Sequence, residues 1–550
     1  MRDNWVGWTQ GVVIVLVVAL VGSFFLFGMA GGPAPPPPVP SASPSTQTPP
    51  AVDPTGPQPG VPTVPLDQHP VWEVGDDVNP DRQLDVDADA GIDLPQALGD
   101  GLAAYWGQSV EWEPCGEQLC ATVLAPLDWE DPGRAAVEIA MRKVPSADPT
   151  LGPLFVNPGG PGFGGQDFAV QLGPDKWPGY DVIGWDPRGT GESTTVECGT
   201  TEETDEVFGL DASPDDEAEE VALEQGWAAF ARQCREGSGE LLDHLTTIEN
   251  VRDLDLLRFL VGAETLNYVG VSYGTYVGAV YAELFPDRAG RLVLDSAVDI
   301  TDDEESASQS EGFELALRNY ADWCEEAEAC TLGQTSTQVV DEIADFLAGL
   351  DAEPLEVGDR LLTQSLATTG VALFLYSDEQ AYPSLTYVLT AAMKGEAGDL
   401  LKAADQLNGR GANDYETIAH AFPATRCADW ADEGVDAAYQ WWEESKADSP
   451  VFGTNMGVDF VCETWTADSG PQLRLTAEGA PTILVVGTTG DSATPYEHAV
   501  SMAEQLEPAV LLTFDGAGHG AVTGGNECVE AAVEKYLVEG VAPEDGTTCS

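Results

Sequence analysis

The chain has 550 residues, of which 43% are hydrophobic, so it can form one large or two medium domains and is not a disordered protein. It carries 22 basic and 94 acidic residues, for a formal net charge of -72. A protein this acidic repels the phosphate backbone of DNA or RNA, which excludes nucleic-acid binding, and it is also repelled by anionic lipid surfaces.

The N-terminal segment predicts insertion into a membrane. Residues 11–30 form a run of 20 residues without a charge, which as a helix spans about 30 Å, the thickness of the hydrocarbon core of a bilayer. Arg2 precedes this run and the next lysine or arginine is Arg82, so residues 1–10 are expected in the cytoplasm and the rest of the chain outside it. We expect an uncleaved anchor; the alternative is a signal segment that is cleaved after export.

The rest of the chain divides by composition. Residues 31–98 are first dominated by proline and then acidic, and they predict an extended linker. Residues 99–299 alternate short apolar runs with amphipathic segments, as in a parallel sheet covered by helices on both faces. A mostly helical pattern at 300–479 interrupts this alternation, which resumes at 480–550. The sequence therefore predicts an α/β fold with a mostly parallel sheet and a helical cap domain inserted late in it.

The strands of the predicted sheet are short apolar runs, and the helices lie between them. We expect strands at residues 121–125, 136–142, 153–157, 181–185, 266–271, 291–294, 482–487 and 510–514. We expect helices at residues 251–261, 276–284, 496–505 and 526–539.

A G-x-S-x-G motif from Gly270 to Gly274 marks Ser272 as the candidate nucleophile. The motif alone is common, but here an expected strand precedes it and an expected helix follows it directly. This is the setting of a nucleophile elbow, in which the serine hydroxyl stands above the sheet at the N-terminus of a helix. The alternative is a close-packed strand–helix turn without chemistry.

A serine hydroxyl needs a base to take its proton. Of the five histidines, His519 lies in a glycine-rich loop (GAGHG) after the last expected strand, where the base of such a site is found. The acid should follow the preceding strand, and Asp491 does so, in a position to orient His519 and stabilise the imidazolium. Asp295, after an earlier strand, is the runner-up for this role.

Acyl transfer also needs hydrogen-bond donors aimed at the developing oxyanion. The segment NPGGPG, which starts at Asn157, follows an expected strand, and its glycines let backbone N–H groups approach a ligand. We assign one donor to the N–H of Gly160, with Gly159 as the alternative, and the other to the N–H of Tyr273.

Together, GVSYGTYVG, NPGGPGFGG, WDPRGTGES, GTTGDSATP and GAGHG resemble the exported bacterial tripeptidyl aminopeptidases, which are serine peptidases of the α/β-hydrolase fold related to proline iminopeptidases. The resemblance runs from about residue 112 to residue 549. It implies that Ser272, Asp491 and His519 form the catalytic triad and that Gly160 and Tyr273 form the oxyanion hole. Some members of the family act as carboxylesterases or endopeptidases, so the substrate preference stays open.

The resemblance also implies recognition of a free amino end, which calls for a carboxylate near the substrate. The cap is so acidic that no carboxylate stands out by type. Asp429 is our candidate, with Trp430 beside it to pack on the substrate. The alternative is an acid that only neighbours a structural disulfide.

The ten cysteines are even in number and lack the close CxxC pairs of zinc or redox sites, which favours disulfides in an oxidising compartment. The exported location that the resemblance implies, taken with nearest-neighbour order, suggests one set of pairs. These pairs are a hypothesis, because connectivity cannot be deduced from sequence. They are Cys115–Cys120, Cys198–Cys234, Cys324–Cys330, Cys427–Cys462 and Cys528–Cys549.

We therefore expect a monomeric, extracytoplasmic serine aminopeptidase, anchored or secreted, that releases tripeptides or dipeptides from short peptide substrates through an acyl-enzyme. It needs no metal and no organic cofactor, and it meets the membrane only through its N-terminal segment. One alternative is a carboxylesterase with the same triad. Another is a non-catalytic peptide- or wall-binding protein on a hydrolase scaffold.

Overall fold

The computed structural model describes residues 42–53, 56–72, 91–173, 175–301, 306–430 and 434–550. Within these ranges, no helix combines the length and the apolar character needed to cross a membrane. The predicted anchor at residues 11–30 lies outside the described residues.

Within the described ranges, one sheet of eleven strands runs in the order β1-β2-β3-β4-β6-β5-β7-β8-β11-β12-β13. Neighbours from β6 to β13 in this order are parallel, and β1 to β4 form an antiparallel extension that joins β6 through β4. The strands are β1 (Ser45–Gln47), β2 (Val110–Cys115), β3 (Gln118–Pro126), β4 (Ala136–Val144), β5 (Gly152–Asn157), β6 (Tyr180–Trp185), β7 (Leu266–Val271), β8 (Ala289–Asp295), β11 (Ile483–Gly490), β12 (Ala509–Ala517) and β13 (Thr547–Cys549).

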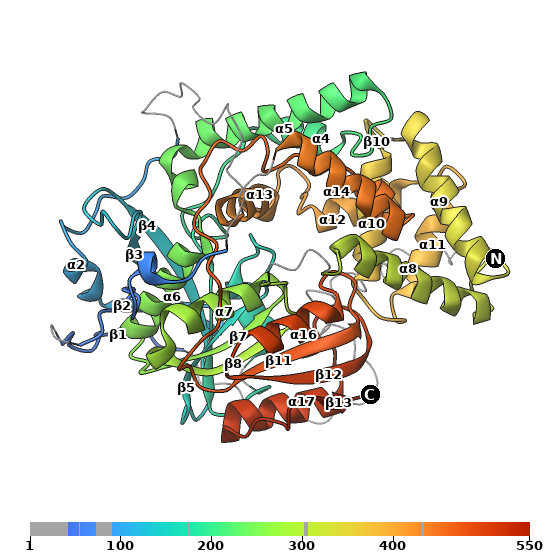
Figure 1. Ribbon diagram of the computed structural model, residues 1–550. Helices are drawn as coiled ribbons and strands as arrows, with labels where there is room; N and C mark the ends of the chain where they lie inside the picture. Colours follow the sequence, from blue (N-terminus) through green and yellow to red (C-terminus); the bar gives the residue numbers. More distant parts are fainter. Residues whose placement is uncertain (1–41, 54–55, 73–90, 174, 302–305, 431–433) are drawn as a thin grey trace, which may run out of the picture.

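Helices cover both faces of the sheet (Figure 1), which is why its central strands are continuous apolar runs rather than alternating ones. Alternate residues of each strand enter two separate cores: Phe155 and Tyr268 lie in one, and Val156 and Val269 lie in the other. The first core is closed by α6 (Thr247–Leu260), α7 (Tyr273–Leu284) and α16 (Tyr496–Gln505). The second core is closed by α3 (Gly165–Leu172), α17 (Glu527–Glu534) and its π-helical continuation η4 (Lys535–Glu539).

A helical cap with its own hydrophobic core follows β8. Its chain returns to the sheet at β11, as the insertion pattern predicts. The cap holds α8 (Gln309–Glu326), α9 (Ser336–Ala352), the hairpin β9 (Leu355–Val357) and β10 (Arg360–Leu362), α10 (Gln364–Leu375), α11 (Tyr382–Ala392), α12 (Gly398–Leu407), α13 (Ile418–Asp429), α14 (Val435–Asp448) and α15 (Phe452–Asn455).

Two helices that were not predicted from the sequence also belong to the cap. They are α4 (Thr201–Phe208) and α5 (Glu217–Ser238), which lie between β6 and β7 in the chain and beside α10, α12 and α14 in space (Figure 1). The Arg410 guanidinium binds the Asp205 carboxylate at 2.7 Å, and the Ala212 N–H donates to the Ser365 hydroxyl at 3.2 Å. The cap is therefore built from two segments of the chain.

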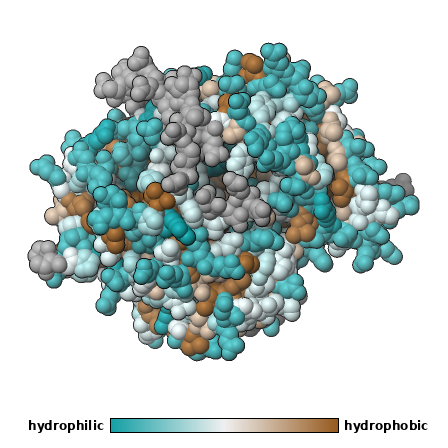
Figure 2. All heavy atoms as spheres, viewed as in Figure 1, coloured by the Kyte–Doolittle hydropathy of each residue, from teal (hydrophilic) through white to brown (hydrophobic). Residues whose placement is uncertain are grey.

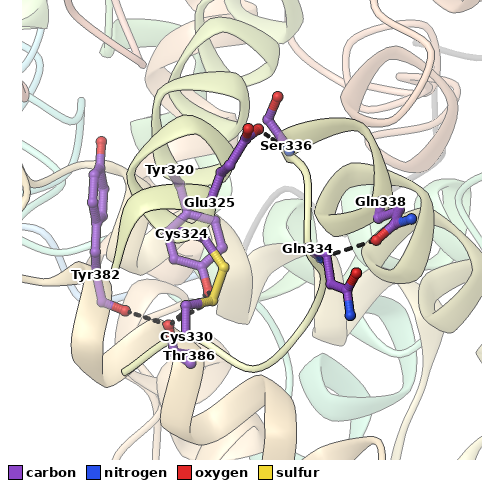
Figure 3. The surroundings of a disulfide bond; sticks show 9 residues. All are labelled: Tyr320, Cys324, Glu325, Cys330, Gln334, Ser336, Gln338, Tyr382 and Thr386. Atoms are coloured by element: carbon purple, nitrogen blue, oxygen red, sulfur yellow. Dashed lines mark hydrogen bonds between the residues drawn. A yellow bond between two sulfur atoms is a disulfide. The ribbon is translucent and has the colours of Figure 1, made fainter. Parts of the chain in front are cut away.

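All ten cysteines lie in the described residues and form five disulfides, and the pairs are those that nearest-neighbour order suggests. Figure 3 shows Cys324–Cys330, which joins the last turn of α8 to the connection with α9. There the Glu325 carboxylate accepts the Ser336 N–H at 2.7 Å, at the start of α9. The bond and this contact fix how the cap helices α8 and α9 are joined.

The surface agrees with the composition. Figure 2 shows hydrophilic residues over most of one face, with only scattered hydrophobic ones. Among the described residues, the cores are apolar and most acidic side chains lie outside them.

Candidate active site

The predicted site residues gather at one edge of the sheet, because the strands that carry them are parallel neighbours whose carboxyl ends meet there. Asn157 and Asp295 end β5 and β8, and Ser272 and Asp491 directly follow β7 and β11. His519 comes two residues after the end of β12.

Ser272 lies in a sharp turn between β7 and α7, with φ 58° and ψ -130°. This left-handed φ is strained for a residue with a side chain. The flanking glycines make the turn possible, because a Cβ at Gly270 would lie 2.2 Å from the Gly274 carbonyl oxygen and one at Gly274 would lie 2.9 Å from the Asn157 carbonyl oxygen. The motif is thus the strand–turn–helix of a nucleophile elbow.

His519 and Asp491 form a hydrogen-bonded pair. The Nδ1–H of His519 donates to Asp491 Oδ1 at 2.8 Å and lies 3.1 Å from Oδ2. Oδ1 also accepts the N–H groups of Ala493 and Thr494 at 3.0 Å each, and Asp491 as a whole residue is 1% exposed. These bonds fix the imidazole so that its other nitrogen is the one left for proton transfer.

Charge pairing outweighs burial in this pair. Burial disfavours both charged forms, but the attraction between the groups holds the pKa of Asp491 below its usual value and raises the pKa of His519. Asp491 therefore stays ionised and stabilises the imidazolium.

Asp295, the runner-up acid, connects the serine turn to the histidine loop. Its carbonyl accepts the Ser272 N–H at 3.0 Å, and its carboxylate accepts the N–H groups of Ala521 and Val522 at 3.2 and 2.8 Å. Burial and the nearby Asp491 charge raise its pKa to about 7. The hydrogen bond from His519 Nδ1 goes to Asp491, and Asp295 instead holds the loop that follows His519.

The segment NPGGPG that starts at Asn157, here called the oxyanion loop, packs against the candidate nucleophile. A Cβ at Gly159 would lie 2.9 Å from Ser272 Cβ and 3.1 Å from the Tyr273 nitrogen, so only glycine fits there. The Gly159 N–H donates to Asn157 Oδ1 at 2.8 Å, which favours Gly160 over Gly159 as the donor of this loop. Tyr273 is the first residue of α7, so its N–H has no acceptor within the helix.

Two cap segments touch this machinery. No sequence motif predicted the first, and the second is the helix that ends at the candidate Asp429. The Tyr376 carbonyl, just after α10, accepts the His519 N–H at 2.9 Å, and the Tyr376 ring meets the imidazole edge-on at 5.5 Å. Helix α13 covers the oxyanion loop, because a Cβ at Gly162 would lie 2.9 Å from the Phe422 nitrogen.

Asp429, at the end of α13, is linked through Thr247 to Tyr273, the residue after the candidate nucleophile. It is 5% exposed and accepts two hydrogen bonds from Thr247, from the N–H and from the hydroxyl, both at 2.7 Å. The Thr247 hydroxyl also bonds the Tyr273 hydroxyl, and Trp430 packs on Tyr276 with ring centroids 5.4 Å apart. Burial raises the pKa of Asp429 to about 7.

Three clusters of carboxylate and histidine side chains could each hold a cation, and among the described residues none of these clusters includes Asp491 or His519. They are Asp128 with His244 and Glu249, Asp211 with Glu219 and Asp351, and Asp215 with Asp216 and Glu219.

Comparison with known proteins gives one family model and several relatives. Residues 449–549 match the family model described as TAP-like protein. Carboxylesterase B of Mycobacterium tuberculosis is 36% identical over 469 residues, which are 80% of this chain and 89% of that protein. Serine protease Hip1 of the same organism is 32% identical, over 80% of this chain and 91% of that protein. Tripeptidyl aminopeptidase of Streptomyces coelicolor is 30% identical, over 83% of this chain and 89% of that protein.

Proposed function

Because the chain belongs to the tripeptidyl aminopeptidase family of α/β-hydrolase serine hydrolases, we propose that it is an extracytoplasmic serine aminopeptidase that releases tripeptides or dipeptides from free N-termini. The observation that carries this proposal is the hydrogen bond from His519 to Asp491 at the sheet edge where Ser272 occupies an elbow. The five disulfides support an oxidising, extracytoplasmic compartment.

In the proposed mechanism, Ser272 attacks the scissile carbonyl while His519 takes its proton. The N–H groups of Gly160 and Tyr273 stabilise the oxyanion. His519 then gives the proton to the leaving amine, which departs and leaves an acyl-enzyme. Water, deprotonated by His519, hydrolyses this ester, while Asp491 stabilises the imidazolium in both steps.

Asp429 is the proposed partner of the substrate ammonium group. It is a buried carboxylate beside the nucleophile turn, and no basic side chain pairs with it in the part of the chain that the structure describes. A buried charge without a partner is costly, and an ammonium group would supply the missing charge.

The proposal predicts that free-amine substrates are strongly preferred. We expect Ala-Ala-Ala p-nitroanilide to have a kcat/KM at least about 30-fold above that of its N-acetyl form, because acetylation removes one partner of a buried ion pair. Asp429→Asn should reduce this ratio to near one. If Asp429→Asn still preferred the free-amine substrate over its N-acetyl form, another group would have to bind the ammonium.

A carboxylesterase is the second candidate, because carboxylesterase B of Mycobacterium tuberculosis is more similar to this chain than the Streptomyces aminopeptidase is, at 36% against 30% identity. The same substrate pair decides between them. Equal rates for free and N-acetylated substrates, with faster turnover of simple p-nitrophenyl esters, would favour the esterase.

The pKa of His519 makes a prediction about pH. His519 must be neutral to act as the base, so kcat/KM should rise with pH through its pKa, which Asp491 raises above the ordinary value of about 6.5. In Asp491→Asn this attraction is lost, so the rise should move to lower pH. The measurement is the pH profile of kcat/KM in both proteins; a rise at the same pH in both would show that Asp491 does not set this pKa.

A further inference from the structure

The segment WDPRGTGES, which starts at Trp185, has no part in the proposed mechanism. Its Asp186 directly follows β6, at the same edge of the sheet as the candidate active site. Asp186 is 3% exposed, and no basic side chain pairs with it in the described part of the chain. A buried carboxylate without a basic partner is costly, so its other contacts must compensate for the lost hydration.

Amide groups take the place of a basic partner for Asp186. The carboxylate accepts the Gln166 N–H at 3.2 Å and the Gln166 Nε2–H at 2.7 Å. It also accepts the Glu192 N–H at 2.8 Å. Gln166 lies in the first turn of α3, where backbone N–H groups have no acceptor within the helix and a negative charge is favoured. The carboxylate therefore fixes the start of α3 to the end of β6.

Glycines let the backbone approach Asp186 closely from two segments. A Cβ at Gly164 would lie 2.6 Å from Asp186 Oδ1, and a Cβ at Gly191 would lie 2.2 Å from Oδ2. A Cβ at Gly165 would lie 2.4 Å from the Trp185 carbonyl oxygen. Asp186 is therefore packed against both the segment that leads into α3 and the loop that follows β6.

The start of α3 is close to the proposed oxyanion donor. Only two residues separate the oxyanion loop, which ends at Gly162, from α3. The turn between them is tight, because a Cβ at Gly160 would lie 3.0 Å from the Gly162 nitrogen and 3.1 Å from the Phe163 nitrogen. So short and close-packed a connection cannot absorb a shift of α3, and Gly160 would move with the helix.

The loop after β6 also holds the cap helix that covers the oxyanion loop. The Gly191 N–H donates to the Thr417 hydroxyl at 3.0 Å, and Thr417 directly precedes α13. Helix α13 packs on the oxyanion loop at Gly162, where a Cβ would lie 2.9 Å from the Phe422 nitrogen and 3.2 Å from Ala421 Cβ. The loop after β6 thus contacts both the region of the helix that covers the oxyanion loop and, through Asp186, the helix that follows it.

We propose that Asp186 is a positioning residue for acyl transfer, which holds the Gly160 N–H where the oxyanion forms by joining β6, α3 and the loop after β6. It does not contact the substrate and it transfers no proton. An oxyanion donor acts only within about 2.7–3.1 Å of the oxygen, so a small displacement of Gly160 weakens its effect. This inference rests on the proposed hydrolase function, but it holds for peptides and esters alike, because both form a tetrahedral oxyanion.

The test compares Asp186→Asn with the wild type. The amide keeps the shape of the side chain but turns its own N–H toward at least one of the three donors, so the start of α3 should shift. We expect kcat to fall about 10–100-fold, below the full cost of losing an oxyanion donor, and KM to change less than about threefold.

A matched pair of inhibitors separates positioning from a general loss of structure. A tripeptide aldehyde forms a hemiacetal with the nucleophile, and its oxygen then occupies the oxyanion hole. In Asp186→Asn its affinity should fall by about the same factor as kcat/KM, because it resembles the transition state. The corresponding tripeptide alcohol has no carbonyl group and should bind as tightly as it does to the wild type.

Asp181→Asn is the matched control. Asp181 lies near the start of β6, at the opposite end of the same strand, and its carboxylate also accepts a backbone N–H, that of Ser146 at 2.9 Å. Its kcat and aldehyde affinity should stay within about twofold of the wild type. All rates are expressed per site titrated with a fluorophosphonate, so unfolded protein does not count.

Gln166→Met keeps the test decisive if Asp186→Asn does not fold. It retains the Asp186 carboxylate and its backbone contacts but removes the Nε2–H that Gln166 donates. The support of α3 is then weaker rather than lost, so kcat and aldehyde affinity should both fall about three- to tenfold.

The outcomes separate this inference from the proposed function. Wild-type kcat and aldehyde affinity per titrated site in the folded variants would overturn the positioning role, even if their thermal stability falls. Equal losses of affinity for the aldehyde and the alcohol would also overturn it. If Ser272 is labelled and peptides are cleaved in either case, the proposed function stands. If only esters are turned over, the peptidase proposal fails, and the same comparison of variants with ester substrates still decides the role of Asp186.

Discussion

Replacing Ser272 by alanine should lower kcat by about 10⁶, because the three residues of a triad act as a unit and loss of the nucleophile removes the covalent pathway. The residual rate would come from substrate binding and the oxyanion donors, Gly160 and Tyr273. The measurement is kcat for the best p-nitroanilide tripeptide, with circular dichroism to verify that the variant is folded.

Ser296→Ala is the matched control for this experiment. Ser296 also has a left-handed φ, of 55°, and lies at the same sheet edge, but its hydroxyl accepts the Gly520 N–H at 2.8 Å and bonds the Asp491 carboxylate, so it supports the acid and the histidine loop. Its loss should weaken the support of the histidine loop and reduce kcat far less than Ser272→Ala does. Comparable losses in both variants would mean that the damage is structural, and Ser272 would lose its assignment as the nucleophile.

Asp491→Asn should lower kcat by about 10⁴ while the fold is retained. The amide keeps the shape of the side chain but presents an N–H toward His519 Nδ1, so the imidazole turns to the wrong tautomer and its imidazolium loses a counter-charge. The effect should appear in kcat rather than KM, because Asp491 acts through His519 and does not contact the substrate.

Asp295→Asn tests the other candidate acid at the same edge of the sheet. Its amide would leave one of the two N–H groups of Ala521 and Val522 without an acceptor, so we expect the free energy of unfolding to fall by about 1–3 kcal/mol. Its kcat should remain much closer to wild type than that of Asp491→Asn. If Asp295→Asn had a much lower kcat than Asp491→Asn, Asp295 rather than Asp491 would be the catalytic acid.

Much of the sheet could be predicted from the sequence, because its central strands are buried on both faces and stand out as apolar runs. Every expected strand corresponds to an observed one, from β3 to β12. The strands at the two ends of the sheet, β1, β2 and β13, were missed. The outer strands β1 and β13 have only three residues each, and β13 pairs at a disulfide-linked terminus, so neither forms an apolar run.

The residues proposed for the triad could be predicted for a related reason. Each follows a strand, and parallel strands bring their carboxyl ends together, so chain order alone put Ser272, Asp491 and His519 at one edge. The contacts within the cap could not be predicted in this way, because its helices are not ordered by a parallel sheet. Phe208 and Phe452 line one pocket of the cap although they lie far apart in the chain, and no local pattern links them. Helix α5 was missed because its acidic sequence buries only a few residues, Leu223 and Phe230 among them.

The measurement that tests the central claim most directly is the site of covalent modification. The protein is treated with a fluorophosphonate probe, digested and mapped by tandem mass spectrometry, in the wild type and in His519→Ala. We predict one adduct, on Ser272, and a strongly reduced rate of labelling in His519→Ala, because the hydroxyl then lacks its base. An adduct on another residue, or labelling of Ser272 at an unchanged rate in His519→Ala, would contradict the account.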